Sequence, residues 1–485
     1  MIVFLLFGGV GRLAQAQGFG VYEQGTCVMG RAGAAVADGC DDGSGIYFNP
    51  AHLAGATGIT ASVGATVIDA SGEFTYDYTT RRPYTGVDVD LENDPIPVPH
   101  GYVTYGVTDA LGVGLGLYVP YGLETNWPGR LSDGSVFDGA FEGFANRVQA
   151  IYVQPTAAYQ ITPRLRVGGG PVLAISAVEL NQVQDLSQVS VPGEEATFGQ
   201  LGVPFHTAFA QSRLEANNDL GIGANIGATY LATDRLSVGL RFTTPITVSY
   251  EGEATFGQIE TGLVFPSTSP LAQDLNGDGT PDPTPADALL ASQFGPRGVL
   301  DQYRDRARSD GTLSTQGVET EITFPLQLVG GLQFEATDRL RLLADYQFTG
   351  WSSFDEIPLQ FERLSDRTRE EGYENTHAVR LGAEYDVLDP LTARIGYLYN
   401  TAAAPDEVVT PLLPESDRNQ FTIGAGWRPV ETVELNVSYQ LLQQNDRRGR
   451  VRSARPGEDV TTALNQGLYS FGANLFGATL TLHLN

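Results

Sequence analysis

Residues 18–53 read GFGVYEQGTCVMGRAGAAVADGCDDGSGIYFNPAHL and differ in character from the rest of the chain. The stretch is rich in small residues, contains both cysteines of the chain, Cys27 and Cys40, and ends near Asn49-Pro50-Ala51. It has neither the polar–apolar alternation of a strand nor the apolar stripe of a long amphipathic helix. The chain that follows does alternate, to its end. The sequence therefore predicts a compact plug over residues 17–55, followed by one large β-structure.

Alternation is clear in residues 340–348, where the even positions are apolar and the odd positions include Arg341 and Asp345. Residues 433–441 repeat the pattern, with apolar odd positions and polar even positions. A strand with one apolar and one polar face fits two architectures. A soluble sandwich hides the apolar face inside, whereas a membrane barrel turns it to lipid around a polar lumen.

The lengths of the connections separate these two architectures, because short and long connections alternate strictly along the chain. Six are very short turns, at residues 108–110, 162–164, 233–235, 337–339, 388–390 and 429–431. Between them lie long polar connections, near residues 70–98, 121–146, 181–215, 252–316, 353–372, 401–417 and 444–465. Outer-membrane barrels show this pattern, with short periplasmic turns and long extracellular loops. A soluble sandwich is not expected to place all its short connections at one end and all its long connections at the other.

The segments between these connections give 14 predicted strands, and the fold class is therefore all-β. We expect a 14-stranded antiparallel transmembrane β-barrel over residues 56–485, with an N-terminal hatch plugging its lumen. An even number of strands closes the barrel without a free edge, as lipid requires. The predicted strands span residues 57–70, 99–109, 111–120, 147–162, 164–180, 216–232, 235–251, 317–335, 339–352, 373–387, 390–400, 418–429, 431–443 and 466–484.

Composition excludes several classes of protein. The 485 residues include 57 acids against 29 Lys and Arg, for a net charge of -28, so a basic nucleic-acid-binding face is not expected. An aromatic content of 10% argues against disorder. No stretch offers the roughly 20 consecutive apolar residues of a transmembrane helix.

Residues 1–16 read as a truncated signal peptide, with an apolar segment before the small-x-small site Ala14-Gln15-Ala16. The basic residues that normally open such a peptide are missing, which indicates a mis-assigned start codon in an exported protein. Export places Cys27 and Cys40 in an oxidising compartment. There a pair of cysteines more often forms a disulfide than a metal or redox site.

Several motifs resemble, in order and spacing, those of the FadL/TodX (OmpP1) family, the outer-membrane transporters of long-chain fatty acids and other hydrophobic compounds. The hatch carries Gly18-Phe19, Gly30-Arg31-Ala32, Ala37-Asp38 and Asn49-Pro50-Ala51, and the barrel carries Pro120-Tyr121-Gly122-Leu123, residues 349–354 and residues 414–418. The resemblance implies that Asn49, Pro50 and Ala51 anchor the hatch. It also implies that the third strand kinks inward at Pro120, Tyr121 and Gly122, where proline cannot donate to a strand ladder. The C-terminal Leu484-Asn485 departs from the terminal Phe usual in the family.

Inward-facing arginines are candidate ligand-binding residues, because a charge facing lipid at mid-depth costs about 2–4 kcal/mol. The candidates are Arg241, Arg341, Arg380 and Arg394. One function would be to bind a substrate carboxylate bidentately. The alternative is a ladder of arginine–acid pairs that braces the barrel.

Residues 274–285 carry a calcium-like spacing of oxygen ligands in the longest external loop. Asp274, Asn276, Asp278 and Asp282 occupy positions 1, 3, 5 and 9 of such a loop, and Gly279 occupies position 6. Position 12 is Pro285 instead of Glu, so the loop is not an EF-hand. Either a weak calcium site or a solvated turn fits this sequence, and no cofactor is otherwise required.

The sequence predicts a monomeric barrel in the outer membrane of a Gram-negative bacterium, contacting lipid and taking up a hydrophobic small molecule passively. Long-chain fatty acids are the leading class, and aromatic hydrocarbons are the alternative. A structural or adhesive barrel is a different reading, which the hatch disfavours. An enzyme is not expected, because the five His show no metal-ligand spacing and Gly-x-Ser-x-Gly is absent. An outer-membrane lipase would have only His377 as a plausible base.

Overall fold

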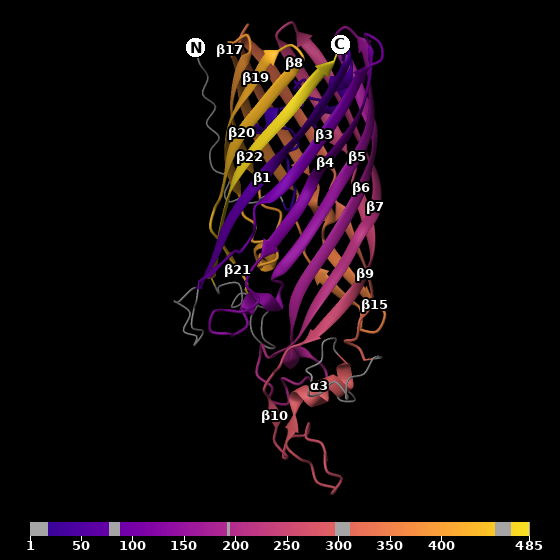
Figure 1. Cartoon of the computed structure of the whole chain (residues 1–485), viewed down its shortest axis with the longest axis vertical. Coiled ribbons are helices and arrows are strands. Elements are labelled where there is room, and N and C mark those ends of the chain that lie inside the picture. The colour runs from indigo at the N-terminus through magenta and orange to yellow at the C-terminus, as the bar shows by residue number, and fades with distance from the viewer. Residues whose placement is uncertain (1–17, 77–87, 192–194, 296–310, 452–466, 485) are drawn as a thin grey trace, which may run out of the picture.

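The computed structural model describes residues 18–76, 88–191, 195–295, 311–451 and 467–484. The predicted signal peptide lies outside these residues. Among them, no helix has both the length and the apolar character needed to cross a bilayer. The chain forms a closed β-barrel that is elongated along its strands, with short turns at one end and long loops at the other (Figure 1).

Each wall strand of the barrel pairs antiparallel with its neighbours, and β1 pairs with β22 over 18 residue pairs, which closes the ring. The predicted 14-stranded antiparallel barrel is confirmed, when two strands that are each interrupted once are counted as single strands. The wall consists of β1 (Ile59–Tyr76), β3 (Ile96–Gly106), β4 (Leu111–Asn126), β5 (Ala145–Thr162), β6 (Leu165–Asp185), β7 (Ala208–Thr233), β8 (Leu236–Thr243) with β9 (Ile246–Gln258), β12 (Gln316–Phe324) with β13 (Gln327–Thr337), β14 (Leu340–Thr349), β17 (Thr376–Leu388), β18 (Leu391–Asn400), β19 (Arg418–Val430), β20 (Val433–Gln444) and β22 (Gly467–Leu484).

The two interruptions lie side by side and have the same cause. β8 gives way to β9 at Thr244-Pro245, and β12 gives way to β13 at Pro325-Leu326. Ile246 pairs with Phe324, and Thr243 pairs with Gln327, so the breaks face one another across the ladder. Each break contains a proline, which has no amide hydrogen to donate to the ladder and so favours an interruption there.

A recurrent threonine shapes four of the six short turns. The hydroxyl oxygens of Thr108, Thr162 and Thr337 each accept the amide of the leucine that begins the next strand, at 3.0 Å. Thr233 accepts the amide of Arg235 at 3.3 Å. A side-chain acceptor stands in for a backbone carbonyl and closes the turn without a long loop.

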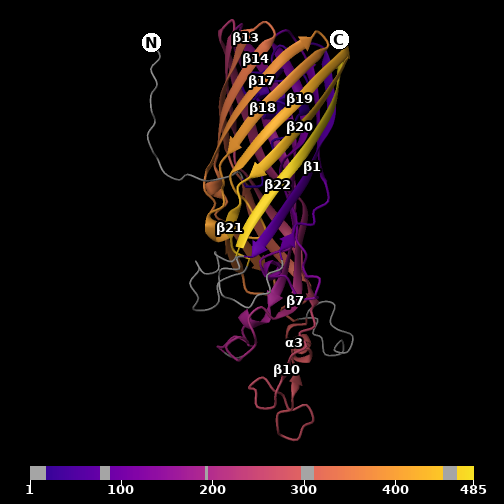
Figure 2. The same cartoon turned by 90° about the vertical axis from the view of Figure 1, so that its left-hand side faces the viewer.

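The opposite end carries a projecting cap built from long connections (Figures 1 and 2). Its core contains Leu186, Phe198, Phe209 and Phe294, all buried. The loop elements are β2 (Val89–Asp90), η2 (Asp138–Phe141), η3 (Leu186–Gln188), β10 (Val264–Phe265), β11 (Thr284–Pro285), α3 (Ala286–Phe294), η5 (Trp351–Ser353), β15 (Glu356–Phe361), β16 (Arg367–Glu370), η6 (Asp406–Val408) and β21 (Arg447–Gly449). Several strands run further toward this end than the sequence predicts, and β7 begins at Ala208 and not at residue 216, whereas β14 and β17 stop three residues short of the predicted bounds.

Candidate functional site

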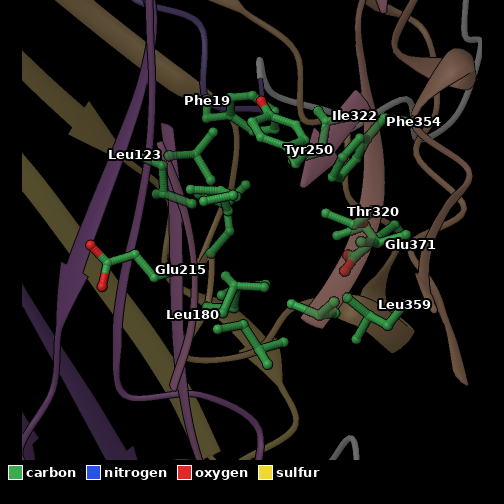
Figure 3. A pocket seen from close by; sticks show the side chains of 18 of the residues that line it. Phe19, Leu123, Leu180, Glu215, Tyr250, Thr320, Ile322, Phe354, Leu359 and Glu371 are labelled. Atoms are coloured by element: carbon green, nitrogen blue, oxygen red, sulfur yellow. The ribbon is translucent and has the colours of Figure 1, made fainter. Parts of the chain in front are cut away.

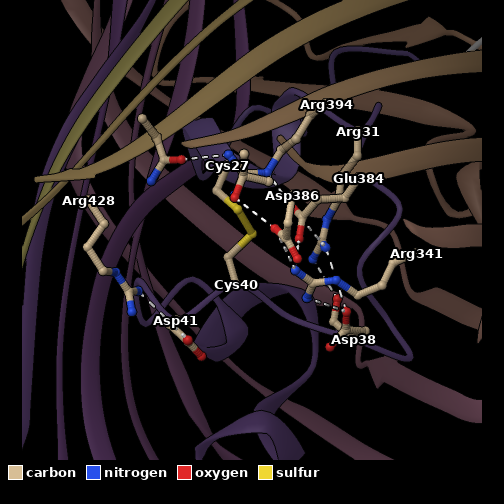
Figure 4. Close-up of polar contacts among 12 residues, drawn as sticks. Cys27, Arg31, Asp38, Cys40, Asp41, Arg341, Glu384, Asp386, Arg394 and Arg428 are labelled. Carbon is tan, nitrogen blue, oxygen red and sulfur yellow. Dashed lines mark hydrogen bonds and ion pairs between the residues drawn. A yellow bond between two sulfur atoms is a disulfide. The ribbon is translucent and has the colours of Figure 1, made fainter. Parts of the chain in front are cut away.

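The hatch fills the lumen with short elements held by a disulfide. It contains α1 (Thr26–Met29), α2 (Gly45–Phe48) and η1 (Pro50–Leu53), and a disulfide joins Cys27 to Cys40 (Figure 4). The enclosed loop is short, with a sequence separation of 13. Closing a loop of this size stabilises a fold by about 3 kcal/mol in the chain-entropy model.

Glycines on the inner face of the wall let the hatch backbone approach closely. A Cβ at Gly396 would lie 2.6 Å from the amide nitrogen of Ala32, and one at Gly382 would lie 2.8 Å from the carbonyl oxygen of Arg31. A Cβ at Gly239 would overlap the carbonyl of Val36. The abundance of glycine in these strands is thus a requirement of hatch packing.

Asn49 is fully buried and ties the hatch both to itself and to the wall. Its Nδ2 donates to the carbonyl oxygens of Val36, at 2.6 Å, and of Ala228 on β7, at 3.1 Å. Its Oδ1 accepts the amide of Ala51 at 3.1 Å and so caps η1, which begins at Pro50. The three motif residues thus lie where hatch and wall meet.

A charged network joins the hatch to strands β14, β17 and β18 (Figure 4). Glu384 on β17 accepts a hydrogen bond from Arg394 Nε at 2.5 Å. It also forms ion pairs with Arg31 of the hatch, at 3.6 Å, and with Arg341. Arg341 lies 3.6 Å from Asp38 of the hatch. Breaking such a buried network by removing one partner is costly, so these pairs fix the hatch in place.

The other two candidate arginines lie over hatch tyrosines. The Arg241 guanidinium stacks 4.9 Å from the Tyr47 ring centroid and donates to the Tyr47 carbonyl oxygen at 3.0 Å. Arg380 lies 4.5 Å from the Tyr22 ring centroid. All four arginines point inward, as the alternation predicts, but their partners are hatch and wall groups. The structure places none of the four among the residues that line the cavities described below.

At Pro120, β4 leaves its neighbour β3 and pairs with the hatch. The β3–β4 ladder ends at Gly101 and Leu117, and the β4–β5 register shifts between Tyr118 and Tyr121. The Val21 amide donates to the Pro120 carbonyl oxygen at 2.8 Å, and the Gly122 amide donates to Phe19 at 3.0 Å. This departure leaves a wall gap, a pocket lined by side chains of β3, β4 and β5 that include Val98, Leu123 and Gln149.

The main cavity lies on the loop side of the hatch, and its lining is almost entirely apolar (Figure 3). It lies between strands β6, β7 and β9 on one side and the β12–β15 region on the other. Val148, Leu180, Ile322 and Ile357 are among its lining residues. Figure 3 shows the carboxylate of Glu215 directed away from the cavity.

An outer chamber continues the main cavity toward the loops. The two spaces share Leu180, Leu214, Ile357, Leu359 and Leu412. The outer chamber adds polar and charged side chains: Glu142, Asn146, Asn181, Gln182, Gln184, Ser212, Arg367, Thr368, Arg369 and Arg450. An apolar space thus opens directly into a polar one with three arginines.

Two of these arginines are paired with carboxylates. Arg369 Nε donates to Glu371 at 2.7 Å, and Arg450 lies 3.5 Å from Glu142. Glu371 lines the main cavity and is 2% exposed. Burial raises the pKa of its carboxyl, and the Arg369 charge opposes that rise.

Phe19 separates the main cavity from an inner chamber, which we define as the pocket around residues 18–23 of the hatch. The two spaces share Phe19, Leu123 and Leu413. The Phe19 ring is 5% exposed and packs edge-on against Trp351, with ring centroids 4.9 Å apart, and against Phe354, at 5.4 Å. The inner chamber also shares residues with the wall gap, including Val21 and Gly122.

The backbone beside Phe19 is clamped by the loop before β19. The amide of Gly18 donates to Glu415, whose other carboxylate oxygen accepts the Ala404 amide at 2.9 Å. Arg418 donates to the Gly18 carbonyl oxygen at 3.2 Å. Burial raises the pKa of Glu415, opposed by the Arg418 charge.

The calcium-like loop is an exposed turn in the projecting cap. Asp274 accepts amide hydrogens from Gly277, at 2.7 Å, and from Gly279, at 2.8 Å. These bonds, the Gly279 bond foremost, lower the pKa of Asp274, and the hydroxyl of Thr280 lowers that of Asp278. Asn276 and Asp282 lie within hydrogen-bonding reach, at 3.4 Å, so the four predicted ligands share one turn.

Sequence reasoning missed Phe19, Arg369, Glu371 and Arg450 as site residues. Their signals are weak: Arg369 and Glu371 lie in a charged run, residues 367–371, that reads as an ordinary solvated loop. Phe19 stands out in the sequence only as part of the Gly18-Phe19 motif.

The fold and this chain of cavities define a class: an outer-membrane β-barrel whose lumen is plugged by an N-terminal hatch. A family model described as outer membrane protein transport protein (OMPP1/FadL/TodX) matches residues 9–483, and the chain belongs to this family.

Three similar proteins illustrate the relationship. The 47 kDa outer membrane protein of Pasteurella multocida is 26% identical over 95% of this chain and 94% of its own length. The long-chain fatty acid transport protein of Salmonella typhi is 21% identical over 88% of each chain. The crystal structure of a Pseudomonas aeruginosa FadL homologue superposes with a TM-score of 0.76, at 18% identity, over 97% of this chain and all of that one.

Members of this family are transport channels, not enzymes. The chain is therefore a transporter of hydrophobic compounds in the outer membrane of a Gram-negative bacterium.

Proposed function

We propose that this transporter takes up long-chain fatty acids, with the alkyl chain in the main cavity and the carboxylate in the outer chamber. The observation that carries the proposal is the continuity of an apolar cavity with a chamber that contains Arg367, Arg369 and Arg450. Arginine suits the recognition of a carboxylate because its planar guanidinium donates two parallel hydrogen bonds. The name of the Salmonella relative supports the same class.

The path that we propose begins in the outer chamber and continues through the main cavity. It passes Phe19 into the inner chamber and leaves by the wall gap at Pro120. The hatch stays seated during this passage, held by Asn49 and by the network around Glu384. We propose that a single barrel suffices, since β1 pairs with β22 and closes the ring within one chain.

Aromatic hydrocarbons are the second candidate, and one observation favours them. Arg369 and Arg450 already pair with Glu371 and Glu142, so a ligand carboxylate must displace a protein carboxylate. A neutral ligand has no such competition.

A double variant, Arg369→Gln with Glu371→Gln, separates the two candidates. Changing both residues leaves no unpaired buried charge, so the chamber keeps its shape. Hydrogen bonds to charged groups contribute about 1.5–3 kcal/mol, and we expect oleate uptake to fall roughly ten- to a hundredfold. Uptake of toluene should stay unchanged. The measurement is uptake of both compounds by cells that lack their own transporter and express this chain.

Arg213→Gln is the matched control, because Arg213 pairs with Glu179 at 2.8 Å on the outer surface of the wall. The Arg213→Gln variant should take up both oleate and toluene at the wild-type rate. Unchanged oleate uptake in the double variant would remove the proposed carboxylate site. A wild type that takes up toluene but not oleate would establish the hydrocarbon alternative. If the cells take up neither oleate nor toluene, the alternative of a structural or adhesive barrel becomes the favoured function.

We also propose that the Asp274–Asp282 loop binds calcium weakly and orders the projecting cap. Its four oxygen-bearing side chains share one turn, and Pro285 replaces the usual bidentate Glu, so we expect a Kd on the order of 10⁻⁴–10⁻³ M. Calorimetry should show calcium binding to the wild type and its loss in Asp278→Ala. Two heat-silent titrations would remove calcium from this loop.

A further inference from the structure

A groove on the lipid-facing side of the barrel lies over β19, β20 and β22, far from the wall gap at Pro120. Figure 2 shows this side of the barrel, with β20, β22 and β1 facing the viewer. Its outward-facing lining includes Asn419 and Phe421 of β19, Leu441 of β20, and Gly472 and Asn474 of β22. The groove is therefore open to the surroundings of the barrel.

The same groove reaches four wall residues whose side chains face inward: Leu442, Gln444, Phe471 and Ala473. All four also line the inner chamber. The groove and the inner chamber therefore meet at the same four residues. From Gly472 to Leu482, β22 keeps a continuous ladder with β20.

The ladder between β20 and β22 ends at the edge of this groove, where Ala473 still pairs with Leu442. The last pair of β20 with β22 is Gln443 with Gly472, and pairing resumes only with β21, at Arg447 and Tyr469. The Asn445 amide donates at 3.2 Å to the carbonyl oxygen of Asp417, beside β19. The chain after β20 therefore leans toward β19 and away from β22.

On its other side, β22 stays fully paired with β1, including Phe471 with Gly72. The break is thus confined to one ladder. Three strands, β22, β1 and β3, lie between it and the wall gap at Pro120.

The rim of the groove is uncharged and interfacial in character. Asn419 accepts from the hydroxyl of Tyr397, and Asn474 accepts from that of Tyr439, both at 2.8 Å. Tyrosines of this kind mark the membrane–water interface of barrels. The apolar Phe421 and Leu441 lie beside these amides. An alkyl chain can rest on the apolar part while its polar head bonds to the amides.

We propose that this break is a second lateral portal, through which an alkyl chain passes between the inner chamber and the outer leaflet. The proposal rests on the proposed uptake of long-chain, hydrophobic ligands. It adds an opening between β20 and β22 beside Gln444 and Phe471, with Gly472 and Ala473 at its edge. The inner chamber then connects to lipid on two sides.

A lipid-contact measurement tests the opening without relying on transport. Ala473→Cys and Leu475→Cys each introduce one reactive thiol, since both native cysteines are in the disulfide. Both residues face the inner chamber, two positions apart on β22, but only Ala473 also lines the groove. A bimane label at 473 should be quenched several-fold more strongly by brominated phospholipid than one at 475. Equally weak quenching at both positions would overturn the portal.

Blocking the mouth tests its use. Gly472→Trp places an indole over the groove from outside, and a Cβ there meets nothing closer than the Leu442 carbonyl oxygen, at 3.3 Å. Gly330→Trp is the matched control on the far wall, where the nearest atom to a Cβ is 3.9 Å away. Oleate uptake should fall several-fold in the first variant and not in the second. If the wild type takes up oleate and the two variants take it up equally well, the proposed portal is wrong.

If the wild type transports neither oleate nor toluene, the proposed function fails. The quenching comparison still decides whether the inner chamber opens to lipid between β20 and β22.

Discussion

Replacing Gly239 with valine should unseat the hatch and convert a gated channel into a leaky one. A Cβ at this position overlaps the carbonyl group of Val36 and lies 2.6 Å from the Ala37 nitrogen. The atoms in the way are backbone, so the hatch must move as a body. Val36 also accepts the hydrogen bond from Asn49, and the anchor is strained at the same time. Overpacking of this kind costs about 1–3 kcal/mol, which shifts a two-state equilibrium roughly 5- to 150-fold.

The measurement is the sensitivity of cells to a hydrophilic antibiotic too large for intact outer membranes, read beside heat-modifiability of the purified barrel. Gly239→Val should raise sensitivity while the barrel remains heat-modifiable. Asn49→Ala should act in the same direction but more weakly, because it removes hydrogen bonds without forcing backbone apart. Gly330→Val on the adjacent β13 adds the same side chain toward lipid and should change nothing. A tight barrel in Gly239→Val would show that the hatch does not depend on these close contacts.

The barrel fold can be predicted from the sequence because the patterns that indicate it are local. Period-two alternation, proline and turn chemistry each act within a few residues, and the alternation of short turns with long loops fixes which strand end faces which side. The predicted strand over residues 317–335 shows the limit, since Pro325 divides it into β12 and β13. The loop-side strand ends are the least predictable: β7 and β9 extend several residues further than predicted, whereas β14 and β17 are three residues shorter there.

The site depends on contacts that no local pattern encodes. Alternation gives the inward direction of Arg241 and Arg380, but not that Tyr47 and Tyr22 of the hatch cover them. Arg369 and Glu371 look solvated in sequence, yet Glu371 is buried and Arg369 half-buried, because loops from distant strands fold over them. A glycine such as Gly239 has no sequence signature that separates close packing from a flexible strand.

Replacing Phe19 with alanine should join the main cavity to the inner chamber and make passage ungated. The ring contacts Trp351 and Phe354 and contributes to the boundary of both spaces. The hatch backbone at residues 19–21 should stay in place, because its main-chain bonds to Pro120 and Gly122 do not involve the Phe19 side chain. Removing a buried phenyl ring costs about 3–5 kcal/mol of packing, and this loss falls on the closed state, in which the ring is buried.

We therefore expect oleate uptake at saturating ligand to rise several-fold in Phe19→Ala, while ligand retained through purification falls. Phe74→Ala is the matched control: Phe74 is equally buried and packs on Tyr469, with ring centroids 4.7 Å apart, away from both spaces. It should lower stability without accelerating uptake. Phe19→Trp should keep the boundary closed and behave like the wild type or more slowly. If Phe19→Ala took up oleate no faster than Phe74→Ala, the barrier would have to lie elsewhere on the path, with the clamp formed by Glu415 and Arg418 the next residues to test.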